Sequence, residues 1–528
     1  MGGMYPGTYA AQTPDRIAAV MAGTGETITY GELERRSVQL ARVLHDKGLK
    51  PGDVVALLTE NSLRALEVYW AALRSGLYIT AVNYRLKPDE VAYIVNDSGA
   101  AALVVSAEQA ATATAVADLT AAVKLRLAFG GAVPGYGSYE DTIAAASDTP
   151  LDDQPQGATM LYSSGTTGRP KGVRPPLPGV QVGEPAEGLV ELARLAFGFN
   201  EDTIYLSPGP IYHAAPLRFC GAVQALGGTV VMMKRFDAEQ ALRAIQDHRA
   251  THAQFVPTMF VRMLQLPPEV RDRYDVSGLR VAIHAAAPCP VQVKQKMIDW
   301  WGPVLLEYYA GTEGNGMTAI DSGTWLTKPG TVGRPILGTV RICADDGTEL
   351  PAGQTGGVYF ERDEVPFTYH NDPAKTQASQ HPAHPTWTTL GDVGYLDEDG
   401  FLFLTDRKAF TIISGGVNIY PQETENALAL HPAVFDVAVI GVPDPEMGES
   451  VAAFVQPAAG AVPGPELEQG IIAFVKSKIA GFKAPRTVHF VDDLPRSEAG
   501  KLVKAELKVK YGISAERSGA SAPGTRPS

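Results

Sequence analysis

The chain is organised around residues 162–172, which read Tyr162-Ser163-Ser164-Gly165-Thr166-Thr167-Gly168-Arg169-Pro170-Lys171-Gly172. These eleven residues hold four Ser/Thr hydroxyls and three glycines, and the glycines let backbone N–H groups approach a polyanion without obstruction by a Cβ atom. Lys171 adds one mobile positive charge. The composition predicts a loop that binds phosphate, and an ordinary Gly/Ser/Thr turn is the competing interpretation.

The loop does not follow the order of a P-loop nucleotide-binding motif. That motif needs Gly directly before its Lys, where this chain has Pro170. No Gly-x-Gly-x-x-Gly pattern follows an expected strand, which argues against a dinucleotide site. The sequence therefore indicates a nucleotide enzyme outside these two classes.

Composition narrows the class of protein further. Of 528 residues, 45% are hydrophobic and 20% are charged, which is typical of a soluble globular protein with several folding units. No apolar run approaches membrane-spanning length, and residues 1–6 lack the pattern of an export signal or lipid anchor. Cys220, Cys289 and Cys343 form no Cys-x-x-Cys pair, which predicts a cytoplasmic location and no structural zinc. A net charge of -13 argues against nucleic acid as a partner, so anionic substrates must meet local positive groups.

Strand and helix patterns alternate over residues 15–124 and again over residues 152–360, which predicts doubly wound α/β layers. The expected strands are residues 54–58, 101–106, 158–162, 229–233, 252–256, 280–284 and 305–306. The expected helices include one that starts near Thr29, residues 62–75 with a cap at Asn61 or Ser62, and residues 238–247. Residues 173–187 hold four prolines and are expected to form a surface loop, neither helix nor central strand.

The pattern changes after residue 332. Short β segments with turn signals predict a β subdomain over about residues 332–405. A compact α/β unit follows over residues 410–512, and the Ser/Gly/Ala/Pro-rich tail, residues 513–528, is expected to be disordered.

Three polar residues could bind a nucleotide. Glu313 follows a buried strand pattern, where a carboxylate beside phosphates is a natural Mg²⁺ ligand. Asp392 could accept both hydroxyls of a ribose, and the guanidinium of Arg407 could bridge phosphate or ribose. For each residue an ordinary loop or surface side chain is the competing interpretation.

Two further residues could act on a second substrate. Lys501 lies in a glycine-punctuated loop and could stabilise charge that develops on a carboxylate and a phosphate. His213 follows an apolar strand and could gate an acyl cavity, with a histidine at the edge of the core as the alternative.

Taken in order, these motifs resemble the AMP-forming adenylate superfamily of acyl-CoA synthetases, luciferases and peptide-synthetase adenylation domains, over about residues 13–507. The wording of residues 406–421 is similar to a bacterial fatty-acyl-CoA ligase. The resemblance implies an α/β fold with a large N-terminal domain, residues 1–405, of two doubly wound sheets plus the β subdomain. It also implies a hinge at residues 406–409 and a small mobile α/β C-terminal domain.

The resemblance also implies two half-reactions. In the first, the carboxylate of an acid attacks the α-phosphate of ATP and releases pyrophosphate. The residues implied for this step are Ser163, Ser164, Gly165, Thr166, Thr167, Gly168 and Lys171 for the phosphates, Tyr309 for adenine, Thr312, Asp392 and Arg407 for the nucleotide, Thr166 and Glu313 for Mg²⁺, and Lys501 for the carboxylate. Attack of one anion on another needs clustered positive charge more than a general base.

In the second half-reaction, the C-terminal domain turns and the acyl group passes to coenzyme A. The resemblance implies that Ser414, Gly415 and Gly416 lie beside the pantetheine arm, that His213 gates the thiol side, and that Phe482, Lys483 and Arg486 meet the CoA nucleotide. Ala409 departs from the family, which usually has Asp or Lys at this hinge position.

His213 stands where amino-acid-adenylating relatives place an Asp, which favours an unsubstituted acid. Small or apolar residues nearby predict a roomy pocket: Ala214, Ala215, Leu217, Phe219, Cys220, Gly221 and residues 285–287. A medium- or long-chain fatty acid is the first expectation, with a steroid side-chain or aryl acid open. Transfer to a carrier protein, a non-catalytic ATP-binding regulator, a homodimer and peripheral contact with a membrane surface also remain open.

Overall fold

The computed structural model describes residues 4–163, 170–184, 188–407, 410–415, 417–429, 431–496 and 502–510. These residues form two compact units, which divide between residues 407 and 410. Within them, no helix combines the length and the apolar character that crossing a bilayer requires.

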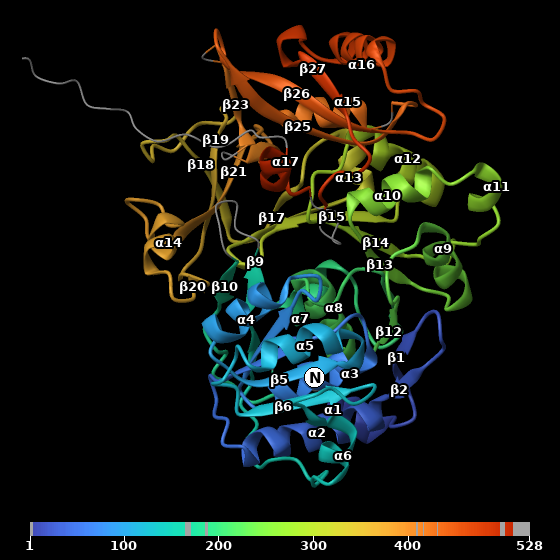
Figure 1. The fold of residues 1–528 in the computed structure, drawn as a ribbon, viewed down its shortest axis with the longest axis vertical. Helices are drawn as coiled ribbons and strands as arrows, with labels where there is room; N and C mark the ends of the chain where they lie inside the picture. Colours follow the sequence, from blue (N-terminus) through green and yellow to red (C-terminus); the bar gives the residue numbers. More distant parts are fainter. Residues whose placement is uncertain are drawn as a thin grey trace, which may run out of the picture. The chain divides into compact units, whose positions relative to one another are not determined.

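A six-stranded, all-parallel sheet forms the first layer of the N-terminal unit (Figure 1). Its order is β7-β6-β5-β3-β4-β8, with β3 (Val54–Leu58), β4 (Tyr78–Val82), β5 (Ala100–Ser106), β6 (Leu125–Phe129), β7 (Gly137–Ser138) and β8 (Ala158–Thr159). The central strand β3 is buried along its whole length, which explains its unbroken run of aliphatic residues. The helices of this part of the chain are α1 (Pro6–Gln12), α2 (Tyr30–Asp46), α3 (Leu63–Leu73), α4 (Pro88–Asp97), the 3-10 turn η1 (Ala107–Gln109), α5 (Ala110–Ala117) and α6 (Tyr139–Ala144).

A nine-stranded sheet forms the second layer, in the order β17-β16-β15-β14-β13-β11-β12-β1-β2. Its strands are β1 (Ile17–Met21), β2 (Thr27–Thr29), β11 (Ile204–Ser207), β12 (Thr229–Met232), β13 (His252–Phe255), β14 (Val281–His284), β15 (Leu305–Ala310), β16 (Met317–Asp321) and β17 (Arg334–Leu337). The strands from β15 to β1 are parallel, and antiparallel strands flank them on both sides. The associated helices are α7 (Leu189–Ala196), α8 (Ala214–Ala225), α9 (Ala238–Asp247), α10 (Pro257–Leu264), α11 (Pro268–Arg271), α12 (Val291–Trp301) and α13 (Ser322–Thr327). Helix α3 contacts α8, and both layers share one buried cluster that includes Leu57 and Tyr205.

Two smaller sheets complete this unit. The first is antiparallel, in the order β20-β10-β9, with β9 (Leu161–Ser163), β10 (Lys171–Arg174) and β20 (Thr368–Tyr369), and α14 (Pro373–Ala378) follows it. The second is the predicted β subdomain, with β18 (Thr339–Cys343), β19 (Gly356–Glu361), β21 (Trp387–Leu396) and β22 (Leu402–Arg407). β17 belongs to the nine-stranded sheet, and the residue range predicted for the hinge begins inside β22.

The C-terminal unit is built on a five-stranded sheet of β23 (Ile412–Ser414), β24 (Val417–Ile419), β25 (Val434–Asp444), β26 (Gly448–Pro457) and β27 (Thr487–Phe490). Its helices are α15 (Pro421–Leu428), α16 (Pro465–Lys478), the 3-10 turn η3 (Gly481–Lys483) and α17 (Lys504–Lys510). The predicted tail, residues 513–528, lies outside the described residues.

Two expectations about the region of the phosphate loop are corrected. The strand expected at residues 158–162 is two strands in different sheets, because β8 pairs with β4 whereas β9 pairs with β10. Val173 and Arg174, expected in a loop, lie in β10, the central strand of its sheet. A residue before proline favours an extended conformation, so Arg174 before Pro175 suits a strand end. From Pro175 to residue 184, the chain forms neither helix nor strand apart from an isolated bridge between Pro155 and Gln181.

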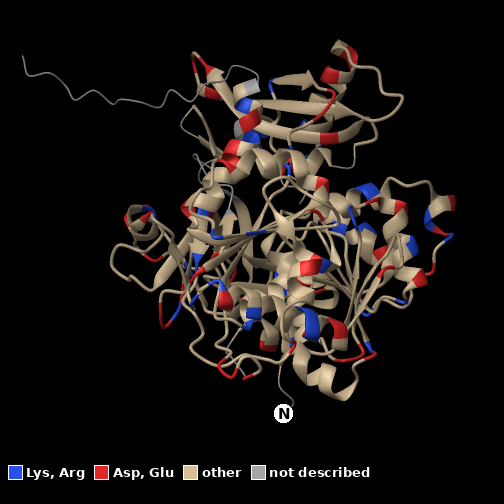
Figure 2. Ribbon diagram, turned by 60° about the horizontal axis from the view of Figure 1, so that its bottom comes forward, with Lys and Arg blue, Asp and Glu red and all other residues tan. Residues whose placement is uncertain are grey.

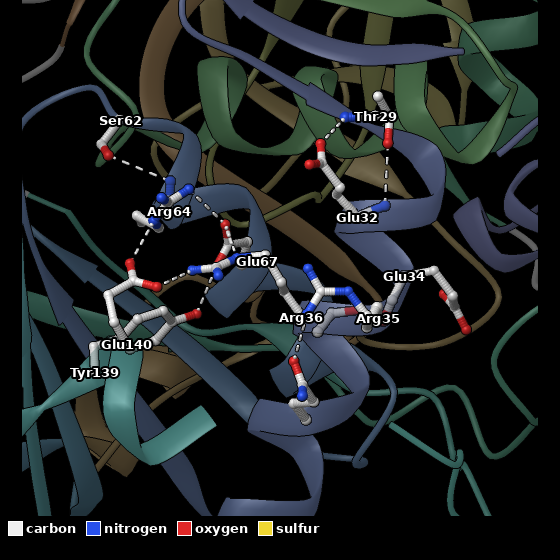
Figure 3. Close-up of polar contacts among 12 residues, drawn as sticks. Thr29, Glu32, Glu34, Arg35, Arg36, Ser62, Arg64, Glu67, Tyr139 and Glu140 are labelled. Carbon is white, nitrogen blue, oxygen red and sulfur yellow. Dashed lines mark hydrogen bonds and ion pairs between the residues drawn. The ribbon is translucent and has the colours of Figure 1, made fainter. Parts of the chain in front are cut away.

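A buried ionic network ties α2, α3 and α6 together (Figure 3). The fully buried Glu67 carboxylate forms ion pairs with Arg36 Nε at 2.8 Å and with Arg64 Nη1 at 2.9 Å. It also accepts a hydrogen bond from the Tyr139 hydroxyl at 2.9 Å. Both arginines also contact Glu140, at 2.7 Å and 2.9 Å. A capping box between Thr29 and Glu32 starts α2, as the sequence predicts for a helix at this position.

Candidate active site

A β-hairpin holds the predicted phosphate loop. β9 and β10 pair in antiparallel register with Ser163 opposite Lys171, so both ends of the loop are fixed by the sheet. Five residues predicted to bind phosphate lie outside the described residues: Ser164, Gly165, Thr166, Thr167 and Gly168. At Ser163 the description covers the backbone alone.

The Lys171 ammonium is paired with the Asp372 carboxylate. Asp372 also caps α14, since its Oδ1 accepts the Lys375 backbone N–H at 2.9 Å. The hydrogen bond from Lys171 is the largest influence that holds the pKa of Asp372 below its ordinary value. The predicted phosphate-binding cation is therefore oriented by a carboxylate that the sequence analysis did not identify.

Glu313 lies in the turn after β15 and is connected to the same hairpin. The Tyr369 hydroxyl donates to Glu313 Oε1 at 2.9 Å, and Tyr369 pairs with Val173 of β10 in the three-stranded sheet. Tyr369, the last residue of β20, contacts Glu313, and Asp372, the partner of Lys171, follows it shortly after in the chain. Within the described residues of this unit, the segment of β20 and the turn after it contacts the predicted lysine through Asp372 and the predicted carboxylate through Tyr369.

Tyr309 and Asp392, predicted as separate contacts to adenine and ribose, are hydrogen-bonded to each other. The Tyr309 hydroxyl donates to Asp392 Oδ2 at 2.6 Å, and Asp392 is buried. The backbone of Asp392 pairs with Arg407 in the register of β21 and β22, although the Arg407 side chain lies outside the described part of the chain. The contact joins the nine-stranded sheet to the β subdomain.

Leu390, two residues before Asp392 in β21, packs against Gly311. A Cβ atom on Gly311 would lie 2.5 Å from Leu390 Cδ1 and 2.9 Å from Glu313 Oε2, so a larger residue at position 311 would require both side chains to shift.

Arg218 is a site residue that the sequence analysis missed. It projects from α8, where its Nε donates to Thr159 Oγ1 at 2.9 Å and its Nη1 donates to the Thr312 carbonyl at 3.3 Å. Thr312, predicted to contact the nucleotide, is thereby held through its backbone. Burial lowers the pKa of Arg218, and the negative charge of Glu313 acts against that effect. The available signal was a single charged residue in an otherwise apolar helix, Ala214–Ala225.

His213 caps the start of α8, with its ring 4.4 Å from that of Tyr212. In the adjoining part of α8, three of the residues predicted to line a roomy pocket are buried. Leu217, Phe219 and Cys220 are at most 2% exposed, and Phe219 stacks on Tyr205 and Tyr308 at centroid distances of 6.3 and 5.8 Å.

Aromatic side chains from neighbouring strands pack against this part of α8, so these residues belong to the core, and the roomy pocket stays a prediction. Gly221 also abuts a ring, since a Cβ atom there would lie 2.5 Å from the Tyr69 hydroxyl. Ala214, Ala215, Ala286 and Ala287 remain partly or fully exposed.

In the C-terminal unit, Ser414 and Gly415 lie at the turn between β23 and β24. Gly415 has φ +57°, and a Cβ atom on it would lie 2.5 Å from Met447 Cε. Lys483 is paired with Glu423, and the neighbouring Phe482 is 57% exposed. Gly416 and Lys501 lie outside the described residues.

Acidic and basic residues are mixed over the molecule (Figure 2). Figure 2 shows acidic and basic residues interspersed along the chain, whose net charge is -13. Among the described residues, no group of three or more His, Cys, Asp or Glu side chains could hold a metal by itself. A Mg²⁺ ion needs only one or two protein oxygens when substrate phosphates supply others, so Glu313 fits such a site.

Parallel α/β layers with a hairpin that ends at Lys171, and a carboxylate joined to that hairpin's sheet through Tyr369, suit the α/β nucleotide enzyme that the sequence predicts. The "AMP-binding enzyme" family matches residues 8–370, and the "AMP-binding enzyme C-terminal domain" matches residues 423–501. The chain therefore belongs to the AMP-binding enzyme family. This confirms the predicted adenylate-forming superfamily and the predicted class of AMP-forming acid–thiol ligase.

Known relatives match almost the whole chain. Feruloyl-CoA synthase from Amycolatopsis sp is 34% identical over 517 residues, which cover 97% of this chain and 99% of the relative. Fatty acid--[acyl-carrier-protein] ligase ScoC from Streptomyces coeruleorubidus is 32% identical over 515 residues, which cover 96% and 95%. A solved ATP-bound RpMatB-BxBclM chimera is 29% identical with a TM-score of 0.79, covering 96% of this chain and 99% of that chain, which confirms the predicted fold class.

Proposed function

We propose that this chain activates a carboxylic acid with ATP to an acyl-AMP and then transfers the acyl group to coenzyme A. The observation that carries the proposal is the connected set of side chains around the hairpin: Lys171 with Asp372, Tyr369 with Glu313, and Arg218 with the Thr312 carbonyl. The set supplies two cations, Lys171 and Arg218, together with the Asp372 and Glu313 carboxylates, and Lys501 would add positive charge where two anions must react.

In the first step, a carboxylate oxygen bonds to the α-phosphorus of ATP, and the bond from that phosphorus to pyrophosphate breaks. Lys171 and the loop residues 163–168 would neutralise the departing pyrophosphate. Tyr309, Asp392 and Arg407 would hold the nucleoside, and the 2.6 Å bond between Tyr309 and Asp392 supports a shared role. Lys501 would bridge the carboxylate and a phosphate oxygen.

Glu313 and Thr166 are the residues proposed to hold Mg²⁺. Bound there, the ion would neutralise phosphate charge. The proposal is supported by the Glu313 carboxylate, which Tyr369 holds in place. Phosphate and water would supply the remaining ligands of the ion.

In the second step, the CoA sulfur bonds to the acyl carbonyl carbon, AMP leaves, and the thiol proton is released. We assign the adenylation domain to residues 1–405, the hinge to residues 406–409 and the mobile domain to residues 410–512. Ser414, Gly415 and Gly416 would lie beside the pantetheine arm, and Lys483 would contact the CoA nucleotide with His213 on the thiol side. The exposed Phe482 beside Lys483 supports the CoA assignment.

An aryl acid is the proposed substrate class, ahead of a medium- or long-chain fatty acid. The aromatic packing of Phe219 and the full burial of Leu217 and Cys220 leave α8 without room for a long chain at those residues. The exposed alanines, Ala214, Ala215, Ala286 and Ala287, would provide a shorter and flatter surface. The 34% identity with a feruloyl-CoA synthase supports the same class.

A panel of acids incubated with ATP, Mg²⁺ and CoA tests this function. The expected result is AMP and acyl-CoA in equal amounts, with ferulate and cinnamate turned over faster than octanoate, palmitate or a steroid side-chain acid. Preference for palmitate would overturn the substrate class, and the absence of acid-dependent AMP would overturn the function.

A carrier protein is the alternative acyl acceptor, favoured by the 32% identity with a fatty acid--[acyl-carrier-protein] ligase. The two acceptors are separated by the fate of the acyl-AMP. Rapid disappearance of acyl-AMP on addition of CoA supports the proposed ligase, whereas acyl-AMP that persists until a phosphopantetheinylated carrier protein is added supports the alternative.

A further inference from the structure

Arg218 is partly buried and differs from three other partly or fully buried arginines of the N-terminal unit. Arg36 and Arg64 both pair with the buried Glu67, and Arg74 pairs with Glu34 at 2.7 Å. Arg218 instead donates only to a hydroxyl and a backbone carbonyl, and within the described residues no carboxylate lies at ion-pair distance from it. Arg126 also lacks a carboxylate partner, but its two Nη atoms donate to three backbone carbonyls, whereas Arg218 makes one such contact.

Removing a guanidinium from water costs free energy unless a charged partner replaces the lost hydration. Two neutral acceptors satisfy two of its N–H groups, and the Glu313 charge acts on it without forming an ion pair. The remaining N–H groups are therefore available to an anion that arrives as a ligand.

The position of Arg218 indicates which anion this is. Ala214 and Ala215 lie four and three residues before it on α8, on the same helix face, and both are partly exposed. Its other contacts are Thr159 at the end of β8 and Thr312 beside Glu313. An acid with its body against the alanines would direct its carboxylate toward this guanidinium.

We propose that Arg218 binds the reacting carboxylate of the acid substrate before adenylation. The inference rests on the proposed function and adds to it a substrate-binding residue that no motif assigns. A planar guanidinium presents two parallel N–H groups to a carboxylate, which holds the acid in one orientation. Formation of the acyl-AMP removes the negative charge, so the contact stabilises the bound acid more than the later complex.

A comparison of two ligands on two proteins tests the proposal. Ferulate and its uncharged primary amide are titrated by calorimetry into the wild-type enzyme and into Arg218→Gln. If the panel above selects another acid, that acid and its amide are used as the pair. The wild-type enzyme is expected to bind the acid about 10- to 100-fold more tightly than the amide, and Arg218→Gln is expected to remove most of this preference while it changes amide binding less than about twofold.

The chain offers a matched control for the loop that Arg218 contacts. Arg362 Nη1 donates to the Gly314 carbonyl at 3.4 Å, so Arg362→Gln removes a similar contact to the same turn. This variant is expected to keep the preference for acid over amide. Arg218→Lys keeps the charge without the planar pair of N–H groups and is expected to recover part of the preference.

Kinetics and thermal melting distinguish acid binding by Arg218 from a role in ATP binding or in stability. Arg218→Gln is expected to raise the KM for the acid about tenfold or more, with the KM for ATP within about twofold, and loss of its bonds to Thr159 and the Thr312 carbonyl is expected to lower the melting temperature only slightly. An equal loss of acid and amide binding, or a rise confined to the KM for ATP, would overturn the proposal. Failure of the proposed function is a different result, namely no acid-dependent pyrophosphate exchange by the wild-type enzyme.

Discussion

The Tyr309 hydroxyl donates to a buried carboxylate, and this single contact joins the adenine and ribose ends of the proposed nucleotide site. Tyr309→Phe removes only the hydroxyl. Because hydrogen bonds to charged groups contribute about 1.5–3 kcal/mol, we expect the KM for ATP to rise about tenfold or more, with the KM for the acid nearly unchanged. Steady-state kinetics with each substrate varied in turn measures the effect.

Tyr395→Phe is the matched control, since Tyr395 lies in the same strand as Asp392, stacked on Phe403 at 5.0 Å. It is expected to leave both KM values unchanged. If the Tyr309 variant shifts the KM for the acid as much as that for ATP, the contact does not organise the nucleotide site.

The site residues differ in how far the sequence could predict them. Glu313 and Lys171 are recognisable because strand ends and glycine-rich loops place such groups together. Asp372 was missed because its pattern, Asn-Asp-Pro, indicates only a helix cap, and its pairing with Lys171 spans 201 positions of sequence. Arg218 was missed because the surrounding apolar residues indicate a core helix.

At the scale of elements, the network around Glu67 holds three helices against the six-stranded sheet (Figure 3). Glu67→Gln leaves Arg36 and Arg64 without their buried carboxylate. Breaking a buried ion pair by removing one partner costs about 3–5 kcal/mol, so we expect the free energy of unfolding of this unit to fall by that order. Urea unfolding followed by tryptophan fluorescence measures the change.

Glu140→Gln provides the comparison, because the Glu140 side chain is 44% exposed and still contacts the same two arginines. Exposed ion pairs contribute about 0–1 kcal/mol, so its effect should be much smaller. Equal destabilisation by the two variants would show that burial of Glu67 is not the source of its contribution.

Helices and strands with a regular hydrophobic pattern were predicted at the right residues, but the neighbours with which strands pair were not. Helix α9 and strand β3 lie at the predicted residues because each has an uninterrupted pattern. The division of residues 158–163 between two sheets depends on which backbone lies alongside, namely Ile79 for β8 and Val173 for β9. Such tertiary pairing leaves no local signal in the sequence.

At the scale of the whole molecule, stability should depend on pH through buried histidines. Burial lowers the pKa of His252 from 6.5 to about 4, and its ring contacts the Phe197 carbonyl at 3.1 Å. Between these pH values the unfolded chain binds more protons than the folded chain, so stability is complete above about pH 6.5 and falls as pH decreases toward 4. The shift corresponds to about 3 kcal/mol.

Urea unfolding at pH 7 and at pH 4.5, for the wild-type protein and His252→Gln, checks this dependence. Other groups contribute to both proteins, so the difference between their pH slopes is the informative quantity. We expect a shallower slope for the variant, and parallel slopes would contradict a neutral buried His252.

A single variant should lose the first half-reaction and keep the second. Lys501→Ala is expected to abolish nearly all acid-dependent adenylation, because the charge proposed to bridge the carboxylate and phosphate is lost. The same variant supplied with pre-made acyl-AMP and CoA should still form thioester. Equal loss of both steps would remove Lys501 from the role proposed for it.

We propose that an acid and ATP form an acyl-AMP in this site. Acid-dependent exchange of labelled pyrophosphate into ATP, measured without CoA, is the sharpest test. We expect exchange that requires Mg²⁺, is strongest with an aryl acid and is greatly reduced in Lys501→Ala. Exchange that is independent of the acid, or release of ADP in place of AMP, would contradict it.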